Sequence, residues 1–481
     1  MLISNDNLIK NTMFKNILCA LGMSLLLLSS CDSYLESETY NSIDSQDAFK
    51  TVDDIKAARN GLYRNLGQDE FCGTNILAMG DFASDMAVAD GSSGHYVSIN
   101  TYSVGDYDSE FQDTWEYGYV VINTSTQALL AIDNLLTDVS LTAAVKNELN
   151  LYKAEIHGLR ALAYFHLVNV FGLPYGTDSN PHGGLVLMSD KAILPMENVS
   201  RSSVEETYEQ ILTDISSSLK AYELTSTKTN GFYFNEAAVN ALKARVLLFM
   251  GNDQLAIDAA TQSLTLRGVK EMNEEGYLGM WKSLTLSDEE IFSIAKSEDD
   301  NLSANSLNTL YGSYGGKLTS SLVADFNEND YRLKLINTDN FHPKKFDGIE
   351  SSASTSNIPQ FRVSEMKLII AEASAKLDLL DDAREALLFT AKRNSEIVSV
   401  TDLPTTKDAL LAFIAKERKR EFFQEGHRFY DARRTGELIT VSNGKYVNFD
   451  VQKFVYPIPA DEVNSGYKCE QNENWFDNLP Q

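Results

Sequence analysis

Apolar residues recur at helical spacing through most of the chain. Apolar side chains about one turn apart fall on the same face of a helix, and that face packs inward. This pattern predicts helices over residues 47–66, 114–136, 141–171, 203–222, 235–251, 253–266, 362–377, 380–393 and 407–433. Ser203 and Glu206 have the spacing of a capping box, and Gly172 and Pro174 end the helix that precedes them. The chain is therefore predicted to be mainly α.

Two pairs of these helices share one spacing of small residues. The intervals are twelve and seven residues in both pairs: Ala244, Ala256 and Ser263 in the first, and Ala371, Ala383 and Thr390 in the second. Small residues at these offsets let the two helices of a hairpin pack closely, as in tetratricopeptide repeats. We therefore expect a tetratricopeptide-like scaffold of helical hairpins.

Residues 67–112 and 268–360 interrupt the helical pattern. The first stretch breaks into short apolar pieces among Gly, Ser, Asp and Tyr, and we expect long loops there. The second contains Glu290–Ile294, which has the composition of a strand, and a stretch rich in glycine and serine. Insertions of this length in a compact fold are usually functional. We expect a loop-rich, partly β lobe over 268–360, carried by a helical N-terminal region (47–267) and by C-terminal helices (361–481).

The N-terminus has the pattern of a signal peptide. Lys10 and Lys15 precede an apolar run over residues 17–28, which is too short to span a bilayer as a stable helix. The run ends in Leu28-Ser29-Ser30-Cys31, which resembles the bacterial lipobox. We expect a lipoprotein signal peptide over 1–30, starting at Met1 or at Met13, and a polar tether over 31–46. The alternative is a buried apolar helix with an incidental cysteine, and the acidic stretch after Cys31 disfavours it.

Composition and charge narrow the class of protein. The 481 residues are 43% hydrophobic, which indicates a folded chain. Acidic residues outnumber basic ones by 68 to 41, so the net charge is −27. Such a charge repels nucleic acid, and no nucleic-acid partner is expected. With Cys31 modified, Cys72 and Cys469 are the remaining candidates for a disulfide, and the sequence leaves open whether they pair.

Motifs of catalysis and metal binding are sparse. The chain contains no Gly-x-Ser-x-Gly elbow, His-Glu-x-x-His helix, P-loop or Cys-x-x-Cys pair. His157 and His166 fall on different sides of a predicted helix, which argues against a shared metal ion. His427 and Asp431 are one turn apart, as in a metal or acid–base pair, but a buried histidine is the more ordinary interpretation. We therefore expect a protein that is not an enzyme and that needs no metal or cofactor.

The most informative segment is residues 416–436, where dense charge alternates with aromatic residues and glycine. Arg418 falls on the apolar stripe of a predicted amphipathic helix, where it can reach a carboxylate, and Gly426 allows a neighbouring backbone to approach closely. Further motifs occur in a fixed order: the lipobox, Glu155-x-x-x-x-Arg160-Ala161-x-x-Tyr164-Phe165, Phe171-Gly172-Leu173-Pro174, Arg362-Val363-Ser364-Glu365, and Tyr456-Pro457-Ile458-Pro459. Together they resemble the SusD/RagB family of nutrient-binding outer-membrane lipoproteins. The chain departs from the family at Asn472-Glu473-Asn474, where Asn-Pro-Gly is common.

The resemblance implies a fold, a location and a function. The fold would be SusD-like, with Cys31 as the lipid anchor that holds the protein on the outer membrane, facing the cell exterior. The protein would bind an oligosaccharide or polysaccharide without cleaving it and deliver it to a SusC-like, TonB-dependent transporter. A peptide-capturing family member is the main alternative. A tetratricopeptide adaptor for proteins and a surface glycosidase are the others.

Ligand contacts are expected among aromatic and polar residues of the two interrupted stretches. A flat ring offers its face to the C–H side of a pyranose, while neighbouring polar groups bind the hydroxyls. The candidates are Phe71, Asp81, His95, Tyr96, Tyr102, Trp281, Asn305, Tyr311 and Tyr314. For each aromatic residue the alternative is that its ring fills a local core.

Overall fold

The computed structural model describes residues 49–188, 191, 197–473 and 475–480. From Phe49 onward the chain forms one compact unit. The predicted signal peptide, Cys31 and the polar tether lie outside the described residues. Within the described ranges, no helix combines the length and the apolar character that a membrane crossing requires.

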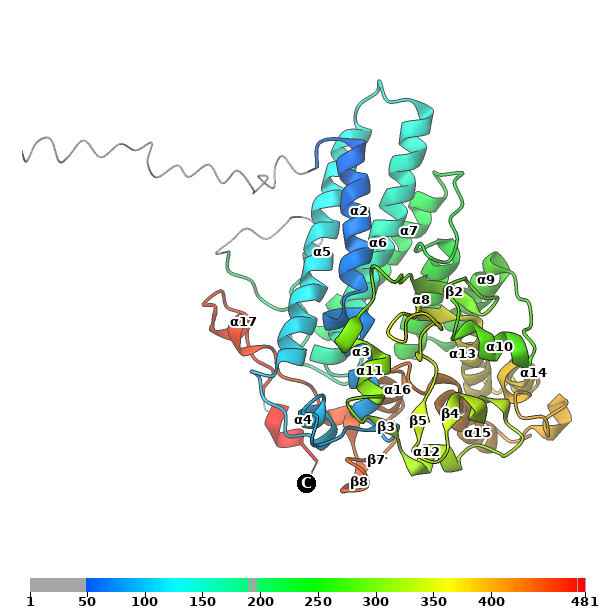
Figure 1. Cartoon of the computed structure of the whole chain (residues 1–481). Coiled ribbons are helices and arrows are strands. Elements are labelled where there is room, and N and C mark those ends of the chain that lie inside the picture. Colours follow the sequence, from blue (N-terminus) through cyan, green and yellow to red (C-terminus); the bar gives the residue numbers. More distant parts are fainter. Residues whose placement is uncertain (1–48, 189–190, 192–196, 474, 481) are drawn as a thin grey trace, which may run out of the picture. The chain divides into compact units, whose positions relative to one another are not determined.

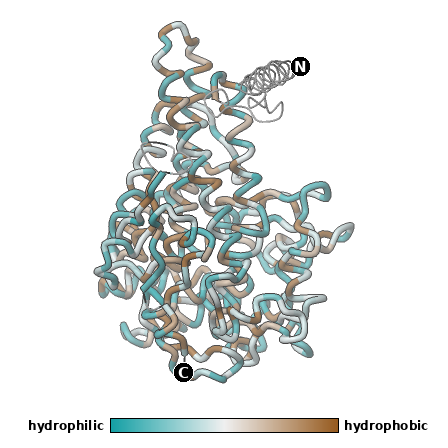
Figure 2. Tube along the Cα trace, turned by 90° about the vertical axis from the view of Figure 1, so that its left-hand side faces the viewer, coloured by the Kyte–Doolittle hydropathy of each residue, from teal (hydrophilic) through white to brown (hydrophobic). Residues whose placement is uncertain are grey.

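Long helices make up the first part of this unit. They are α2 (Val52–Leu66), α5 (Ser109–Leu136), α6 (Ala143–Phe171) and α7 (Val204–Tyr222). Helices α2, α5 and α6 pack against one another, and α7 packs on α6 (Figure 1). The predicted capping box is confirmed, because Ser203 and Glu206 each bind the other's backbone N–H. Apolar and polar residues alternate along these helices in Figure 2, as expected of helices that bury one face.

Two helical hairpins follow the predicted repeat. The first is α8 (Glu236–Phe249) with α9 (Asp253–Arg267), and the second is α13 (Val363–Lys376) with α14 (Leu380–Ala391). The helices of each hairpin pack against each other, and α13 also packs on α9. All six small residues of the repeat are fully buried: Ala244, Ala256, Ser263, Ala371, Ala383 and Thr390. The spacing therefore marks the contact between helices, as predicted.

The stretch from 67 to 112 is more regular than expected. It contains a π-helical turn (Asp69–Gly73), α3 (Asn75–Phe82), β1 (Ala87–Val88) and α4 (Val97–Thr101). The prediction of long loops was wrong for α3. Every residue of α3 is buried, so this helix has no polar face and its sequence lacks the amphipathic period on which the prediction depended.

The lobe from 268 to 360 is loop-rich and partly β, as predicted. Its elements are α10 (Glu274–Met280), β2 (Glu290–Ile294), α11 (Leu307–Tyr311), β3 (Lys317–Leu318), α12 (Ser320–Ala324), β4 (Ile336–Asn337), β5 (His342–Pro343) and β6 (Ile358–Arg362), with short 3-10 turns at Ser303–Asn305 and Tyr331–Leu335. The strands form antiparallel pairs, β2 with β6, β4 with β5, and β3 with β1 of the preceding stretch. The pair β1–β3 ties the lobe to the segment that follows α3.

The C-terminal helix is broken in two, which corrects the single helix predicted over 407–433. The elements here are α15 (Lys407–Phe422), α16 (Arg428–Thr435), β7 (Ile439–Val441), β8 (Tyr446–Phe449) and α17 (Ala460–Asn464), with 3-10 turns at Val400–Asp402, Val451–Lys453 and Trp475–Asn478. The chain turns between α15 and α16 because Gln424 and Gly426 adopt left-handed φ angles of 64° and 74°. This turn, residues 423–427, is called the signature turn below.

Candidate ligand-binding site

Six of the nine candidate side chains lie in the core. Phe71, Asp81, Tyr96, Tyr102, Trp281 and Tyr311 are each less than a tenth exposed. His95 and Tyr314 are half-buried, and Asn305 is exposed. The expectation of direct ligand contact at the surface is therefore kept only for these last three residues.

The buried candidates have partners inside the protein. The ring of Trp281 lies 4.8 Å from Lys345 Nζ, in cation–π geometry. Tyr102 meets the ring of Phe454 edge-on, with centroids 5.2 Å apart. Phe71 meets the imidazole of His166 edge-on at 6.0 Å. Loop position does not distinguish such rings from exposed ones, because the loops fold back on the helices.

His95 and Tyr314 stack face to face at the surface. Their ring centroids are 3.9 Å apart and their planes are inclined by 15°. His95 lies just before α4 and Tyr314 just after α11, so the two rings come from segments far apart in the sequence. The backbone N–H of Tyr314 donates to Thr309 O at 3.0 Å, which fixes the turn that carries the ring. We call this pair the aromatic platform.

Buried rings connect the two halves of the platform to helix α3. Phe82, at the end of α3, lies nearly parallel to Tyr96 (centroids 5.7 Å apart) and to Tyr311 (5.2 Å). Tyr96 follows His95 directly, and Tyr311 comes three residues before Tyr314. The hydroxyl of Tyr311 donates to Asp81 at 3.1 Å. The structure thus brings together four of the candidates, two with half-buried rings and two with buried rings that contact Phe82 instead of solvent.

The backbone beside His95 is strained. Tyr96 and Tyr102, which flank α4, adopt left-handed φ angles of 54° and 55°. This region is unfavourable for a bulky residue, and it persists only where surrounding contacts hold it. The hydroxyl of Tyr96 donates to Asn75, and that of Tyr102 donates to the carbonyl of Ala83. Both anchors belong to α3 or its end, so α3 fixes both ends of α4.

Polar groups lie beside the turn that carries Tyr314. A Cβ atom on Gly315 would come within 2.6 Å of Asp90 Oδ2, so Asp90 lies directly against this turn. His342 bonds to the carbonyl of Tyr311 at 2.9 Å and to Asp347 at 3.0 Å. The hydrogen bond to Asp347 raises the pKa of His342. Asp90, His342 and Asp347 were not predicted from the sequence, because isolated polar residues in loops carry no spacing signal.

Asn305 also lies in the lobe but belongs to a separate contact. Its amide donates to Asp69 at 2.5 Å, between the 3-10 turn before α11 and the π-helical turn before α3.

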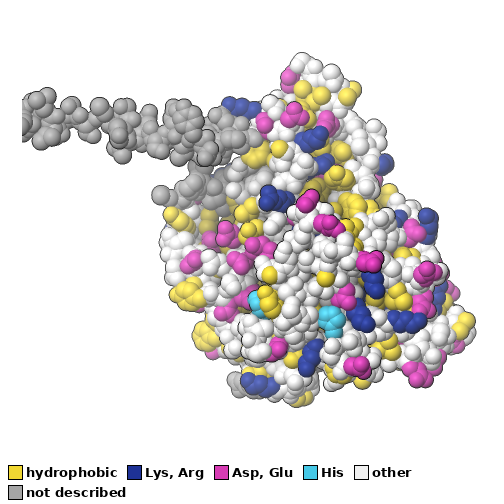
Figure 3. Space-filling model, in the orientation of Figure 1, with side chains coloured by type: hydrophobic (Ala, Val, Ile, Leu, Met, Phe, Trp, Pro, Cys, Tyr) yellow, Lys and Arg dark blue, Asp and Glu magenta, His cyan; other side chains and the backbone are white. Residues whose placement is uncertain are grey.

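Hydrophobic, acidic and basic side chains are interspersed on the face shown in Figure 3, and histidine side chains reach the surface between them. This face therefore presents apolar side chains beside hydrogen-bonding groups.

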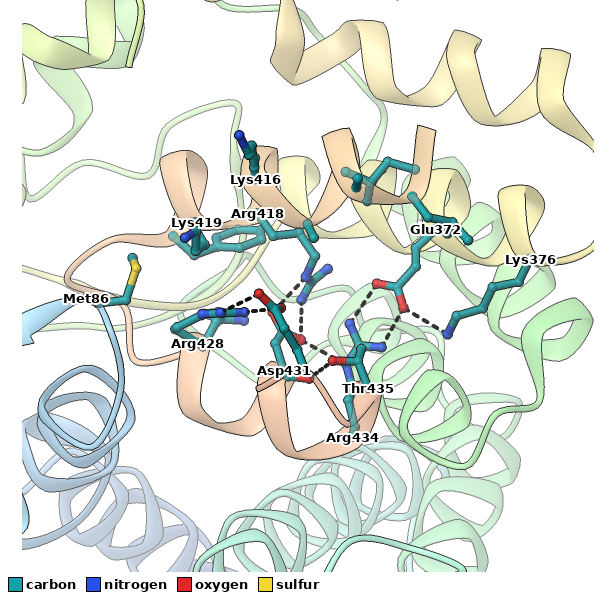
Figure 4. Close-up of a pocket in the computed structure, with 17 residues that line it drawn as sticks. Met86, Glu372, Lys376, Lys416, Arg418, Lys419, Arg428, Asp431, Arg434 and Thr435 are labelled. Carbon is teal, nitrogen blue, oxygen red and sulfur yellow. Dashed lines mark hydrogen bonds and ion pairs between the residues drawn. The ribbon is translucent and has the colours of Figure 1, made fainter. Parts of the chain in front are cut away.

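A hollow of about 510 Å³ lies between α13, α15 and α16 (Figure 4). The arginines at its centre are paired with carboxylates. Asp431 accepts from Arg418 at 2.7 Å and from Arg434 at 2.8 Å, and Arg434 also binds Glu372 at 2.6 Å. The predicted contact of Arg418 with a carboxylate is thus confirmed. We interpret this hollow as part of the architecture.

The side chain of His427 does not pair with that of Asp431, although the two residues are one turn apart in the sequence. The ring of His427 stacks on Phe422 at 4.4 Å, and burial holds its pKa well below the ordinary value. Asp431 binds arginines instead. Across the described ranges, no group of three or more His, Cys, Asp or Glu side chains is arranged to hold a metal ion. Cys72 and Cys469 are both buried and free, so the possible disulfide between them is not formed.

Comparison with known proteins agrees with this fold. Residues 33–248 match a family model described as "Starch-binding associating with outer membrane", and residues 291–475 match the model of the SusD family. The mainly helical fold and these two matches define a SusD-type protein. The chain belongs to the SusD/RagB family.

Individual relatives extend the match over most of the chain. SusD-like protein P38 of Formosa agariphila is 24% identical over 541 residues, which cover 95% of this chain and 99% of the relative. SusD-like protein P2 of the same organism is 28% identical over 242 residues, 49% of this chain but only 43% of that relative. A solved SusD superfamily protein from Bacteroides vulgatus is 27% identical with a TM-score of 0.77, and the match covers 89% of this chain and 100% of that one.

Proposed function

We propose that this protein is a surface lipoprotein that binds an oligosaccharide or polysaccharide without cleaving it and delivers it to a TonB-dependent transporter of the outer membrane. The observation that carries the proposal is the aromatic platform, two flat rings at the surface on separate loops. Family membership supports it, because the model that matches residues 33–248 is described by starch binding at the outer membrane.

The chemistry of the platform suits a sugar ring. His95 and Tyr314 cover one face of each other, so a pyranose would stack on an outer face of the pair. Asp90 and the pair His342–Asp347, beside the same turn, supply acceptors and donors for hydroxyl groups. Stacking and hydrogen bonding retain a ligand without a covalent step.

The location and the partner are further parts of the proposal. We propose that Cys31 carries the acyl chains, which would hold the protein on the outer membrane. Two or more acyl chains anchor a protein stably. Transfer to a transporter requires reversible binding, and a platform at the surface permits it.

Calorimetric titration of the purified full chain tests the proposal. The panel would contain oligosaccharides of α-glucan, β-glucan, xylan, mannan and host glycans, together with a peptide digest. We expect binding to one glycan class, weakened roughly tenfold by Tyr314→Ala or His95→Ala, since a lost stacking contact costs about this much. Tyr107→Ala is the matched control, because Tyr107 is 75% exposed and lies outside the platform.

Three results would contradict the proposal. Binding of peptides with no response to any glycan would make the protein a peptide-capturing member of the family. Glycan binding that Tyr107→Ala weakens as much as Tyr314→Ala would remove the platform as the site. Release of shorter sugars during incubation with the bound glycan would show cleavage.

A further inference from the structure

Phe82 contacts both segments that carry the aromatic platform. Its side chain is fully buried at the end of α3. Its ring lies within 14° of parallel to Tyr96, next to His95, and within 21° of parallel to Tyr311, just before Tyr314. Gly316 comes two residues after Tyr314 in the sequence, and a Cβ atom on it would come within 3.0 Å of Phe82 Cζ. Phe82 therefore touches the turn of Tyr314 both before and after the ring.

Backbone pairing between the two segments is short. Strands β1 and β3 pair through two residue pairs, Ala87 with Leu318 and Val88 with Lys317. This ladder holds residues 87–88 against residues 317–318. The rings of His95 and Tyr314 lie outside it. The stack of Tyr96, Phe82 and Tyr311 supplies a second point of attachment, close to the platform.

We propose that Phe82 is a positioning residue for the aromatic platform, a role that rests on the proposed function of His95 and Tyr314 as the ligand site. The flat ring of Phe82 sets the separation of the two segments, so that His95 and Tyr314 meet before a ligand arrives. Pre-organised contacts raise affinity because ordering the loops no longer opposes binding. Leucine in place of Phe82 would keep the core apolar but would have no flat face to align Tyr96 with Tyr311.

A ligand-free measurement tests this role directly. The ring of Tyr314 lies over His95, so its ring current shifts the imidazole Cε1–H resonance of His95 upfield. This resonance can be recorded in the full chain with isotope-labelled histidine and assigned with His95→Ala. We expect Phe82→Leu to move the resonance toward the position of an unstacked histidine. The matched control is Phe234→Leu, because Phe234 is equally buried but packs on Phe292 and Phe361.

A second variant guards against a failure of Phe82→Leu to fold. Gly316→Ala leaves the core filled and places a Cβ atom 2.8 Å from Leu310 O and 3.0 Å from Phe82, which pushes the turn away from α3. We expect the same shift of the His95 resonance. An unchanged resonance in the folded variants would overturn the positioning role, as would an equal shift in Phe234→Leu.

The outcome separates this inference from the proposed function. If the resonance moves in Phe82→Leu and the affinity for the bound glycan falls roughly tenfold, both stand. If the resonance moves while the wild-type chain binds no glycan, the positioning role stands and the proposed function fails. If the wild-type resonance is unshifted, the platform does not form in solution and the positioning role is overturned.

Discussion

Asp81 is a carboxylate that the fold keeps away from water. It accepts hydrogen bonds from the hydroxyl of Tyr311 at 3.1 Å and from the backbone N–H of Gly426 at 3.2 Å. The charges of Lys345 and Glu425 act on its pKa in opposite directions, Lys345 lowering it and Glu425 raising it. Burial is the dominant effect and raises the pKa of Asp81 from its ordinary 3.8 to about 7. The carboxyl group therefore titrates near neutral pH.

This titration predicts a pH-dependent effect of Asp81→Asn. The folded state holds a proton on Asp81 that the unfolded chain has lost, so the contribution of Asp81 to stability is fully present below pH 3.8 and declines as the pH rises to about 7. Asparagine cannot ionise and avoids this loss. We expect the free energy of unfolding of the variant, relative to that of the wild type, to rise across this window by on the order of 4 kcal/mol in total. Denaturant unfolding at a series of pH values measures the difference, and a difference independent of pH would contradict the expectation.

At the residue scale, the sequence does not distinguish the exposed rings of the site from the buried ones. Loop position predicted four rings at the surface: His95, Tyr96, Tyr311 and Tyr314. Only the rings of His95 and Tyr314 reach it. Residue type and spacing are the same for a ring that covers a core and for one that faces solvent. Tyr96 and Tyr311 are buried because Phe82, at the end of α3, packs against their rings. The contact between Phe82 and Tyr311 joins residues that lie far apart in the sequence.

Helix α3 and the signature turn meet through two glycines. A Cβ atom on Gly80 would come within 1.9 Å of the carbonyl oxygen of Gly426, and one on Gly426 would come within 2.5 Å of Leu77 Cα. A close backbone approach at Gly426 was predicted from the sequence, and the structure confirms it. Because α3 also carries Asp81 and Phe82, this contact links the signature turn to the aromatic platform.

Gly426→Ala is predicted to destabilise the protein strongly. The substitution adds a clash with the backbone of Leu77 and places alanine at a φ angle of 74°. Strain and overpacking together are expected to lower the free energy of unfolding by at least about 3 kcal/mol. Gly279→Ala, in α10, is the control, since a Cβ atom there meets nothing within 4 Å. It is expected to be neutral or to stabilise slightly. Equal unfolding midpoints for the two variants would contradict the account.

At the scale of elements, amphipathic helices were predictable and exceptions had a physical cause. The hairpins α8–α9 and α13–α14 followed from the spacing of small residues, which their contacts require. The break between α15 and α16 did not follow from periodicity, because apolar residues continue through it. It arises where Gln424 accepts a hydrogen bond from the backbone of Lys345 at 3.1 Å and where Gly426 meets α3. Both partners lie far away in the sequence.

At the scale of the whole unit, a buried charge network joins the lobe to the C-terminal helices. Glu421 on α15 is fully buried and binds Arg332 at 3.0 Å, Arg362 at 2.8 Å and Arg393 at 3.0 Å. Arg332 belongs to the lobe, Arg362 ends β6, and Arg393 lies two residues after the end of α14. Burial alone would raise the pKa of Glu421, but the three guanidinium groups outweigh it and hold the pKa far below the ordinary value. The charge of Glu421 on α15 is therefore explained by contacts that hold distant segments together.

Glu421→Gln tests how much the unit depends on this network. Removing one charge leaves three buried arginines with a deficit of negative charge, and breaking a buried pair typically costs about 3–5 kcal/mol. Since the pKa of Glu421 is lowered, its stabilisation is present above the ordinary pKa of 4.5 and declines as the pH falls below it. We therefore expect the variant to lose most stability at neutral pH and progressively less in acid, as measured by denaturant unfolding.

Glu236→Gln is the control, because Glu236 pairs with a largely exposed Lys228 at 3.4 Å, and such surface pairs contribute little. If the two variants were equally stable at neutral pH, the arginines would have to be satisfied by the remaining carboxylates, and Glu421 would not be the centre of the network.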